Sequence, residues 1–115
     1  MMQNKPKNRV VAVVVTYNRL ELLKKCVASL QEQTAPCDVL IVDNASTDET
    51  SQWLKLQTSI AFRNTGSNLG GAGGFNYGMR WAVEAGYDYV WVMDDDTLPK
   101  TNALERLLEA DEILK

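Results

Sequence analysis

The chain has 115 residues, which is the size of one domain. Its 45% hydrophobic and 23% charged residues are typical of a soluble globular protein, and its net charge of −3 argues against nucleic acid as a partner, because a strongly basic face is missing. The sequence contains no histidine, so zinc sites built on histidine are excluded, and any general base has to be Asp or Glu.

Residues 1–9 are polar and basic, and we expect a tail that precedes a single domain over residues 10–115. Residues 10–15 form a nearly continuous β-branched run, which is typical of a strand covered on both faces. Asn18 and Glu21 form a capping-box pattern that predicts the start of a helix. The apolar residues of this helix recur at helical spacing: Leu20, Leu23, Val27 and Leu30.

The middle of the chain repeats this alternation. Residues 39–42 predict the second strand, and Ser46 with Glu49 forms another capping-box pattern, which opens a helix over residues 48–56. Residues 60–63 predict a short third strand.

A glycine-rich loop over residues 68–75 leads into a predicted helix over 76–85. Residues 87–93 are apolar and aromatic, which predicts a buried fourth strand. Asn102 and Glu105 form a third capping-box pattern, at the start of a last helix. Strands that alternate with helices in this way imply an α/β fold, which we expect to be a Rossmann-like parallel sheet of strand order 3-2-1-4 with flanking helices.

Polar residues follow each apolar strand, at 16–19, 43–44, 68–75 and 94–96. The carboxyl ends of parallel strands meet at one edge of a sheet, where ligands bind, so we expect these segments to lie together. Asp43 can accept hydrogen bonds there from a nucleobase or a ribose; the alternative is that it only shapes the turn or caps the next helix.

Three consecutive aspartates, Asp94, Asp95 and Asp96, end the fourth strand. Two like charges about 4 Å apart repel by roughly 4 kcal/mol at an effective dielectric of about 20, and a divalent cation would offset this. Alternation along the strand turns Asp94 and Asp96 to one side, where they could share Mg²⁺ or Mn²⁺. The alternative is a solvated turn with helix-capping aspartates.

The glycine-rich loop also leaves two interpretations open. Its backbone permits close approach of a ligand, and a helix N-terminus attracts anions. The loop lacks the spacing of a dinucleotide fingerprint and of a Walker A motif, and the alternative is tight packing of helix on sheet.

Four motifs together resemble the family 2 glycosyltransferases of GT-A fold: Val-Thr-Tyr-Asn-Arg at 15–19, Val-Asp-Asn-Ala-Ser-Thr-Asp at 42–48, the asparagine and glycines of 68–78, and Met-Asp-Asp-Asp at 93–96. They span most of the chain, which would then be part of a GT-A fold. The last two most resemble the galactofuranosyl- and rhamnosyltransferase-like branch.

The resemblance implies a site for a nucleotide-diphospho-sugar. Thr16 and Tyr17 would hold the base and ribose, with Arg19 nearby, and Asp43 would pair with a uracil-type base edge. Asp95 would contact the ribose or the donor sugar. The chain segment that would approach the nucleotide or its sugar includes Asn68, Gly70 and Gly71.

Asp94 and Asp96 stand where the family's DxD motif binds the diphosphate through Mn²⁺ or Mg²⁺. The family inverts the anomeric carbon by direct attack of an acceptor hydroxyl, which needs a carboxylate base. We expect that base beyond Lys115, because family members continue past this point, and we expect the 115 residues to be an inactive donor-binding half that self-associates through uncovered surface.

The expected reaction moves a sugar from UDP or dTDP to a glycan or lipid-linked acceptor, for example in a cell-wall polysaccharide. The alternatives are a nucleotidyltransferase and a non-catalytic nucleotide- or metal-binding fragment. Cys26 and Cys37 fit thiols of a reducing compartment, and residues 1–9 lack the core of a signal peptide. We therefore expect the cytoplasm, with the inner face of the membrane as the alternative for the parent protein.

Overall fold

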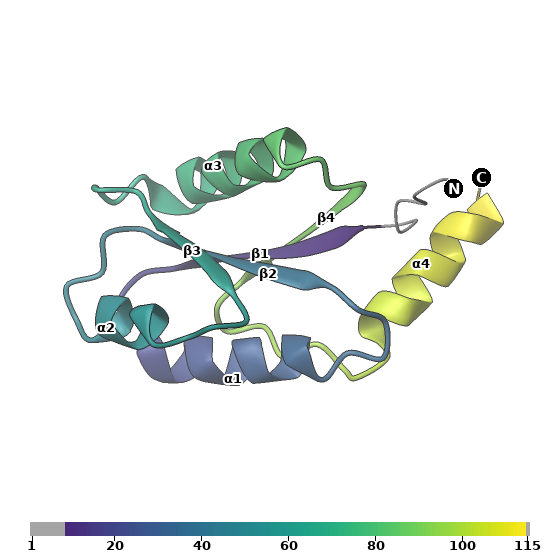
Figure 1. The fold of residues 1–115 in the computed structure, drawn as a ribbon, viewed down its shortest axis with the longest axis horizontal. Coiled ribbons are helices and arrows are strands. Elements are labelled where there is room, and N and C mark those ends of the chain that lie inside the picture. Colours follow the sequence, from purple (N-terminus) through teal and green to yellow (C-terminus); the bar gives the residue numbers. More distant parts are fainter. Residues whose placement is uncertain (1–8, 115) are drawn as a thin grey trace, which may run out of the picture.

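The computed structural model describes residues 9–114. Four strands alternate with four helices (Figure 1). In chain order the elements are β1 (Val10–Thr16), α1 (Leu20–Gln31), β2 (Asp38–Asp43), α2 (Thr50–Lys55), β3 (Ala61–Asn64), α3 (Gly70–Glu84), β4 (Tyr89–Asp94) and α4 (Ala103–Leu114).

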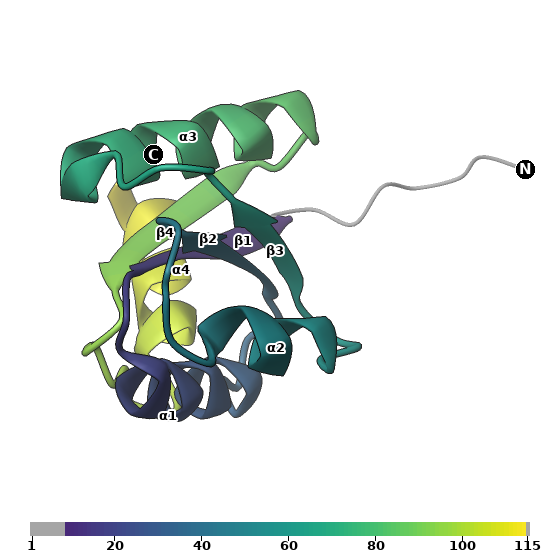
Figure 2. The same cartoon turned by 90° about the vertical axis from the view of Figure 1, so that its left-hand side faces the viewer.

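The strands form one parallel sheet of order β3-β2-β1-β4, which confirms the predicted fold class and strand order. The sheet lies between α3 on one face and α1 and α2 on the other (Figure 2). All seven residues of β1 are buried, as expected for a central strand that is covered on both faces.

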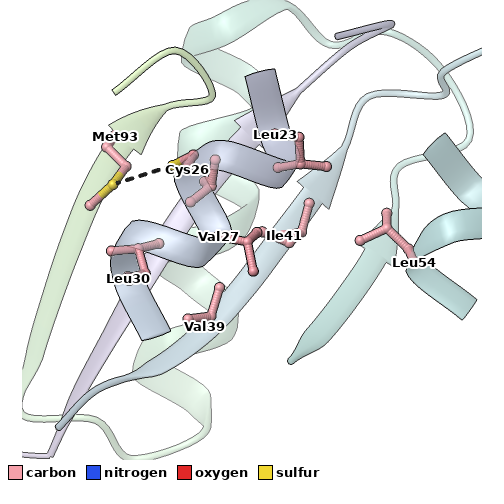
Figure 3. Packing of buried hydrophobic residues seen from close by; sticks show 10 residues of the cluster. Leu23, Cys26, Val27, Leu30, Val39, Ile41, Leu54 and Met93 are labelled. Carbon is pink, nitrogen blue, oxygen red and sulfur yellow. Dashed lines mark hydrogen bonds between the residues drawn. The ribbon is translucent and has the colours of Figure 1, made fainter. Parts of the chain in front are cut away.

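Alternate residues of β1 enter two separate cores. Ala12 and Val14 join the cluster beneath α1, whereas Val11, Val13 and Val15 join the cluster beneath α3. Figure 3 shows the α1 side, where the helix buries Leu23, Val27 and Leu30 as predicted. Cys26 is buried with them, whereas the fourth predicted residue, Leu20, is only partly buried. Burying one such aliphatic side chain contributes about 1.5–3 kcal/mol, so these clusters hold the strand ends in fixed positions.

The predicted start of the third helix is wrong. The glycine-rich segment is not a loop but the first turns of α3, which begins at Gly70. A β-carbon at Gly74 would lie 2.7 Å from Cγ1 of Val15, so the missing side chain lets the helix approach β1. Tertiary packing thus outweighs the low helix propensity of glycine.

Two predicted capping boxes are also wrong. The N-caps of α1 and α2 are Arg19 and Glu49, and neither makes a side-chain cap hydrogen bond. The second helix is shorter than the predicted 48–56. At the start of α4, Leu104 N donates to Oε1 of Gln33, so the end of α1 supplies a partner that local spacing did not indicate.

Candidate functional site

The structure brings the polar residues at the carboxyl ends of the strands together at one end of the sheet. In the parallel register, Thr16 at the end of β1 lies opposite Asp43 of β2, and Val15 lies opposite Asp94 of β4. The backbone N–H of Asn44 donates to the carbonyl of Thr16 over 2.9 Å, which extends this pairing beyond the strands. The candidate site is therefore built on neighbouring strands, whose positions the core fixes.

Asp95 is the buried member of the three aspartates. Its Oδ2 accepts a 2.9 Å hydrogen bond from the Thr16 hydroxyl, and its Oδ1 lies 3.4 Å from Nη1 of Arg19. Burial raises the pKa of Asp95, and the contacts with Thr16 and Arg19 oppose that rise. Both carboxylate oxygens of Asp95 thus have partners within the chain.

Asp94 and Asp96 are exposed, one on each side of Asp95. Neither forms an ion pair with any other residue that the structure describes. Within residues 9–114, no group of three or more acidic, thiol or imidazole side chains lies close enough to hold a metal ion. Two carboxylates still fit Mg²⁺, which keeps several waters and takes further oxygens from the phosphates of a substrate.

Asp43 is buried, and its two carboxylate oxygens differ. Oδ1 accepts a 2.9 Å hydrogen bond from Ser46 N, whereas Oδ2 is buried and has no hydrogen-bond partner among the described residues. An unpaired buried acceptor costs about 1–3 kcal/mol. The turn-shaping alternative for Asp43 therefore accounts for Oδ1 and leaves Oδ2 without a role.

Asn44, which the sequence analysis did not single out, links three segments of the site. Its Nδ2 donates to the carbonyl of Gly70 over 3.0 Å, and its Oδ1 accepts from the Thr65 hydroxyl over 3.2 Å. Thr65 N also donates to the carbonyl of Asp43. The exits of β2 and β3 and the start of α3 are thereby tied together. The only signal in the sequence was the position of Asn44 next to Asp43.

Asn18 is a second residue whose role the sequence analysis missed. It has a positive φ of 54°, and its Oδ1 accepts hydrogen bonds from the backbone of Thr47 and Asp48. Asn18 therefore holds the loop after β2 in place instead of capping its own helix.

The start of α3 is open to a ligand. Asn68, Gly70 and Gly71 are exposed, and a β-carbon at either glycine would meet nothing within 4 Å. Gly70 has a φ of 73°, and its N–H donates to Oδ1 of Asn68. Tyr17, which follows Thr16, is 41% exposed. Among the site residues predicted from the sequence, Thr16 and Arg19 thus contact Asp95. Four others are accessible to a ligand: Tyr17, Asn68, Gly70 and Gly71.

None of the helices in the described part of the chain combines the length and the apolar character that crossing a membrane requires.

Comparisons with known proteins assign the chain to a family. Residues 11–112 match the model of "Glycosyl transferase family 2". The chain is 37% identical over 108 residues to an undecaprenyl-phosphate mannosyltransferase of Micrococcus luteus, an alignment that covers 89% of this chain and 44% of that protein. It is 44% identical over 91 residues to galactofuranosyltransferase GlfT1 of Mycobacterium tuberculosis, covering 76% of this chain and 30% of that protein. The chain thus spans less than half the length of either relative.

Solved structures of glycosyltransferases share the fold. The structure of S. aureus TarS 1-349 in complex with UDP matches with a TM-score of 0.76 and 25% identity, over 90% of this chain and 32% of that one. The mannosyltransferase PcManGT from Pyrobaculum calidifontis, in complex with GDP-Man and Mn²⁺, matches with a TM-score of 0.64 and 29% identity, over 79% of this chain and 28% of that one. With the family model matching nearly the whole chain, this protein belongs to glycosyl transferase family 2, as its motifs led us to expect.

Proposed function

We propose that this chain forms the donor-binding part of an inverting, metal-dependent glycosyltransferase, which moves a sugar from UDP or dTDP to a glycan or lipid-linked acceptor. The observation that carries the proposal is the buried, unpaired Oδ2 of Asp43 on the same sheet edge as the exposed Asp94 and Asp96. Oδ2 of Asp43 can accept a hydrogen bond from a nucleobase, and the carboxylates of Asp94 and Asp96 suit a cation that binds a diphosphate. Relatives in the family are glycosyltransferases, which supports the same reaction class.

The single free oxygen of Asp43 favours uracil or thymine. These bases present one N–H, at N3, between two carbonyls, whereas guanine presents two adjacent donors that suit a carboxylate with both oxygens free. Oδ1 of Asp43 is already occupied by Ser46 N. Oδ2 is covered in this structure, so the base has to displace the atoms that cover it. Tyr17 follows Thr16, which lies opposite Asp43, and its exposed ring would offer a surface on which the base can stack.

Asp94 and Asp96 would hold the cation, Mn²⁺ or Mg²⁺. When bound, such a cation stabilises the negative charge that develops on the leaving diphosphate. Asn68, Gly70 and Gly71 would face the nucleotide or its sugar from the open start of α3. Inversion also requires a carboxylate base on the far side of the sugar, and we place that base outside residues 9–114.

The test is calorimetric titration of the chain with UDP, dTDP and GDP, each with and without Mn²⁺. We expect UDP or dTDP to bind more tightly than GDP, and Mn²⁺ to strengthen binding. Asp96→Ala should remove the effect of Mn²⁺, whereas Glu109→Ala, which removes an exposed acid from α4, should not. A chain that binds none of the three nucleotides would refute the proposal.

A further inference from the structure

Arg19, just before α1, and Asp95, just after β4, form the one ion pair among the described residues that joins separate segments of the chain; the other, Lys24–Glu21, lies within α1. The two partners are 76 positions apart in the sequence. Their surroundings differ, because the side chain of Asp95 is 5% exposed and that of Arg19 is 55% exposed. The buried partner is therefore fixed, and the exposed partner is held at the surface of the site.

The contact with Asp95 engages one of the three nitrogens of the Arg19 guanidinium group. Nη1 of Arg19 is its one nitrogen with a partner in the described part of the chain, at 3.4 Å from Asp95. An arginine has five N–H donors in a planar fork that matches phosphate oxygens. Most of these donors remain available in the segment after β1, next to the turn that carries Asp95.

Asp95 also holds Thr16, whose hydroxyl donates to the second carboxylate oxygen. With Oδ2 on Thr16 and Oδ1 on Arg19, both carboxylate oxygens of Asp95 already have a partner within the chain. The contact with the ribose or the donor sugar, which the resemblance implied for Asp95, stays a prediction beside these two internal contacts.

We propose that Asp95 is a positioning residue, which orients Arg19 so that the free guanidinium N–H groups bind the diphosphate of the donor. This inference rests on the proposed function, since it takes a nucleoside diphosphate as the ligand. Arg19 then supplies positive charge from the segment after β1, in addition to the cation that Asp94 and Asp96 would hold. The helix N-terminus of α1, which begins directly after Arg19, adds to the attraction for an anion.

The experiment compares binding of UDP and of uridine, which lacks the phosphates, by calorimetry in EDTA and in Mn²⁺. We expect Arg19→Gln to weaken UDP binding about tenfold to hundredfold and to leave uridine binding unchanged, because only the diphosphate contacts are lost. Arg19→Lys, which keeps the charge but not the fork, should fall in between. The weaker binding of UDP by Arg19→Gln should also be observed in EDTA, because the contact between Arg19 and the diphosphate does not involve the metal.

Asp95→Asn tests the positioning role, because it removes the charge and nearly preserves the shape. It should weaken UDP binding severalfold in the otherwise unchanged chain and have no further effect in the Arg19→Gln chain. If Asp95 had a purely structural role, Asp95→Asn would weaken uridine binding as well. It would then also weaken UDP binding in the Arg19→Gln chain. Circular dichroism and melting curves identify any variant that does not fold. If Asp95→Asn unfolds, the Arg19→Gln variant still tests the diphosphate contact, because it changes an exposed side chain.

The outcomes separate this inference from the proposed function. If the unchanged chain binds UDP and Arg19→Gln binds it equally well, the role of Arg19 is wrong and the proposed function stands. If Asp95→Asn abolishes the effect of Mn²⁺, Asp95 is a metal ligand and the positioning role is wrong. If the unchanged chain binds no nucleotide, the proposed function fails, and this inference fails with it.

Discussion

A β-carbon at Gly78 would lie 2.4 Å from Cγ1 of Val13, because α3 packs directly on β1 at this point. We therefore expect Gly78→Ala to lower the free energy of unfolding by about 1–3 kcal/mol through overpacking, although alanine is the better helix former. Urea denaturation measures the change. Gly71→Ala is the matched control, since that β-carbon meets nothing within 4 Å, and it should leave stability unchanged or raise it by up to about 1 kcal/mol. Equal effects of the two substitutions would contradict the packing argument.

Replacing Asp43 tests base recognition. In Asp43→Asn, Ser46 N should keep the carboxamide oxygen as its acceptor, so the amide NH₂ takes the place of Oδ2. This group donates, and it suits N3 of cytosine instead of the N3–H of uracil. We expect UDP to bind at least about tenfold more weakly and the preference for UDP over CDP to fall or reverse. Calorimetric titration with UDP and CDP checks this, and an unchanged preference would show that Asp43 does not read the base.

Asn18 supports the loop after β2 through its side chain and through its backbone. Asn18→Ala removes the acceptor for the N–H groups of Thr47 and Asp48 and places a residue with a β-carbon at a φ of 54°. We expect a loss of about 1–3 kcal/mol in the free energy of unfolding. Asn18→Gly loses the same hydrogen bonds but tolerates the positive φ, so it should cost less. Thermal melting of both variants measures the difference, and the opposite order would rule out backbone strain.

The contribution of the buried Cys26 thiol to the free energy of unfolding should depend on pH. Burial raises its pKa from 9.0 to about 11, with smaller contributions from Asp95 and Asp96. Because the folded-state pKa is the higher one, the thiol's contribution to stability is complete below about pH 9 and is lost as the pH rises toward 11. Unfolding free energies of the chain and of Cys26→Ala, compared from pH 8 to 11, should converge. A constant difference over that range would contradict the prediction.

The edge of the sheet at β4 favours self-association. Among residues 9–114, β4 pairs with β1 alone, so its other edge has no strand partner there, and Val92 on this strand is 43% exposed. Unpaired strand edges template pairing with another chain, and a lysine on the edge opposes it. We expect oligomers in sedimentation velocity at high concentration, and fewer of them with Val92→Lys. Leu56→Lys, at a side chain that is 78% exposed after α2, is the control and should not change the distribution. A monomer at all concentrations would refute this expectation.

Most of the candidate site was predictable because it follows directly from strand ends. Asp43 and Asp94 come straight after apolar runs, and parallel strands bring such positions together whatever the details of packing. The partners of Asp95 were not predictable in the same way. Alternation along the strand separated Asp95 from Asp94 and Asp96, but nothing in the sequence indicated that Asp95 would contact Thr16 and Arg19.

The sequence by itself determined the order of strands and helices and the class of the sheet, because apolar runs and helical spacing are local patterns that report which face of an element is buried. The tertiary structure alone decided where α3 begins, and that Asn18 and Gln33 serve segments other than their own. These features depend on which atoms of distant segments meet after folding. Gly74 lies so close over Val15 that a β-carbon would not fit, and no spacing within residues 68–75 carries that information.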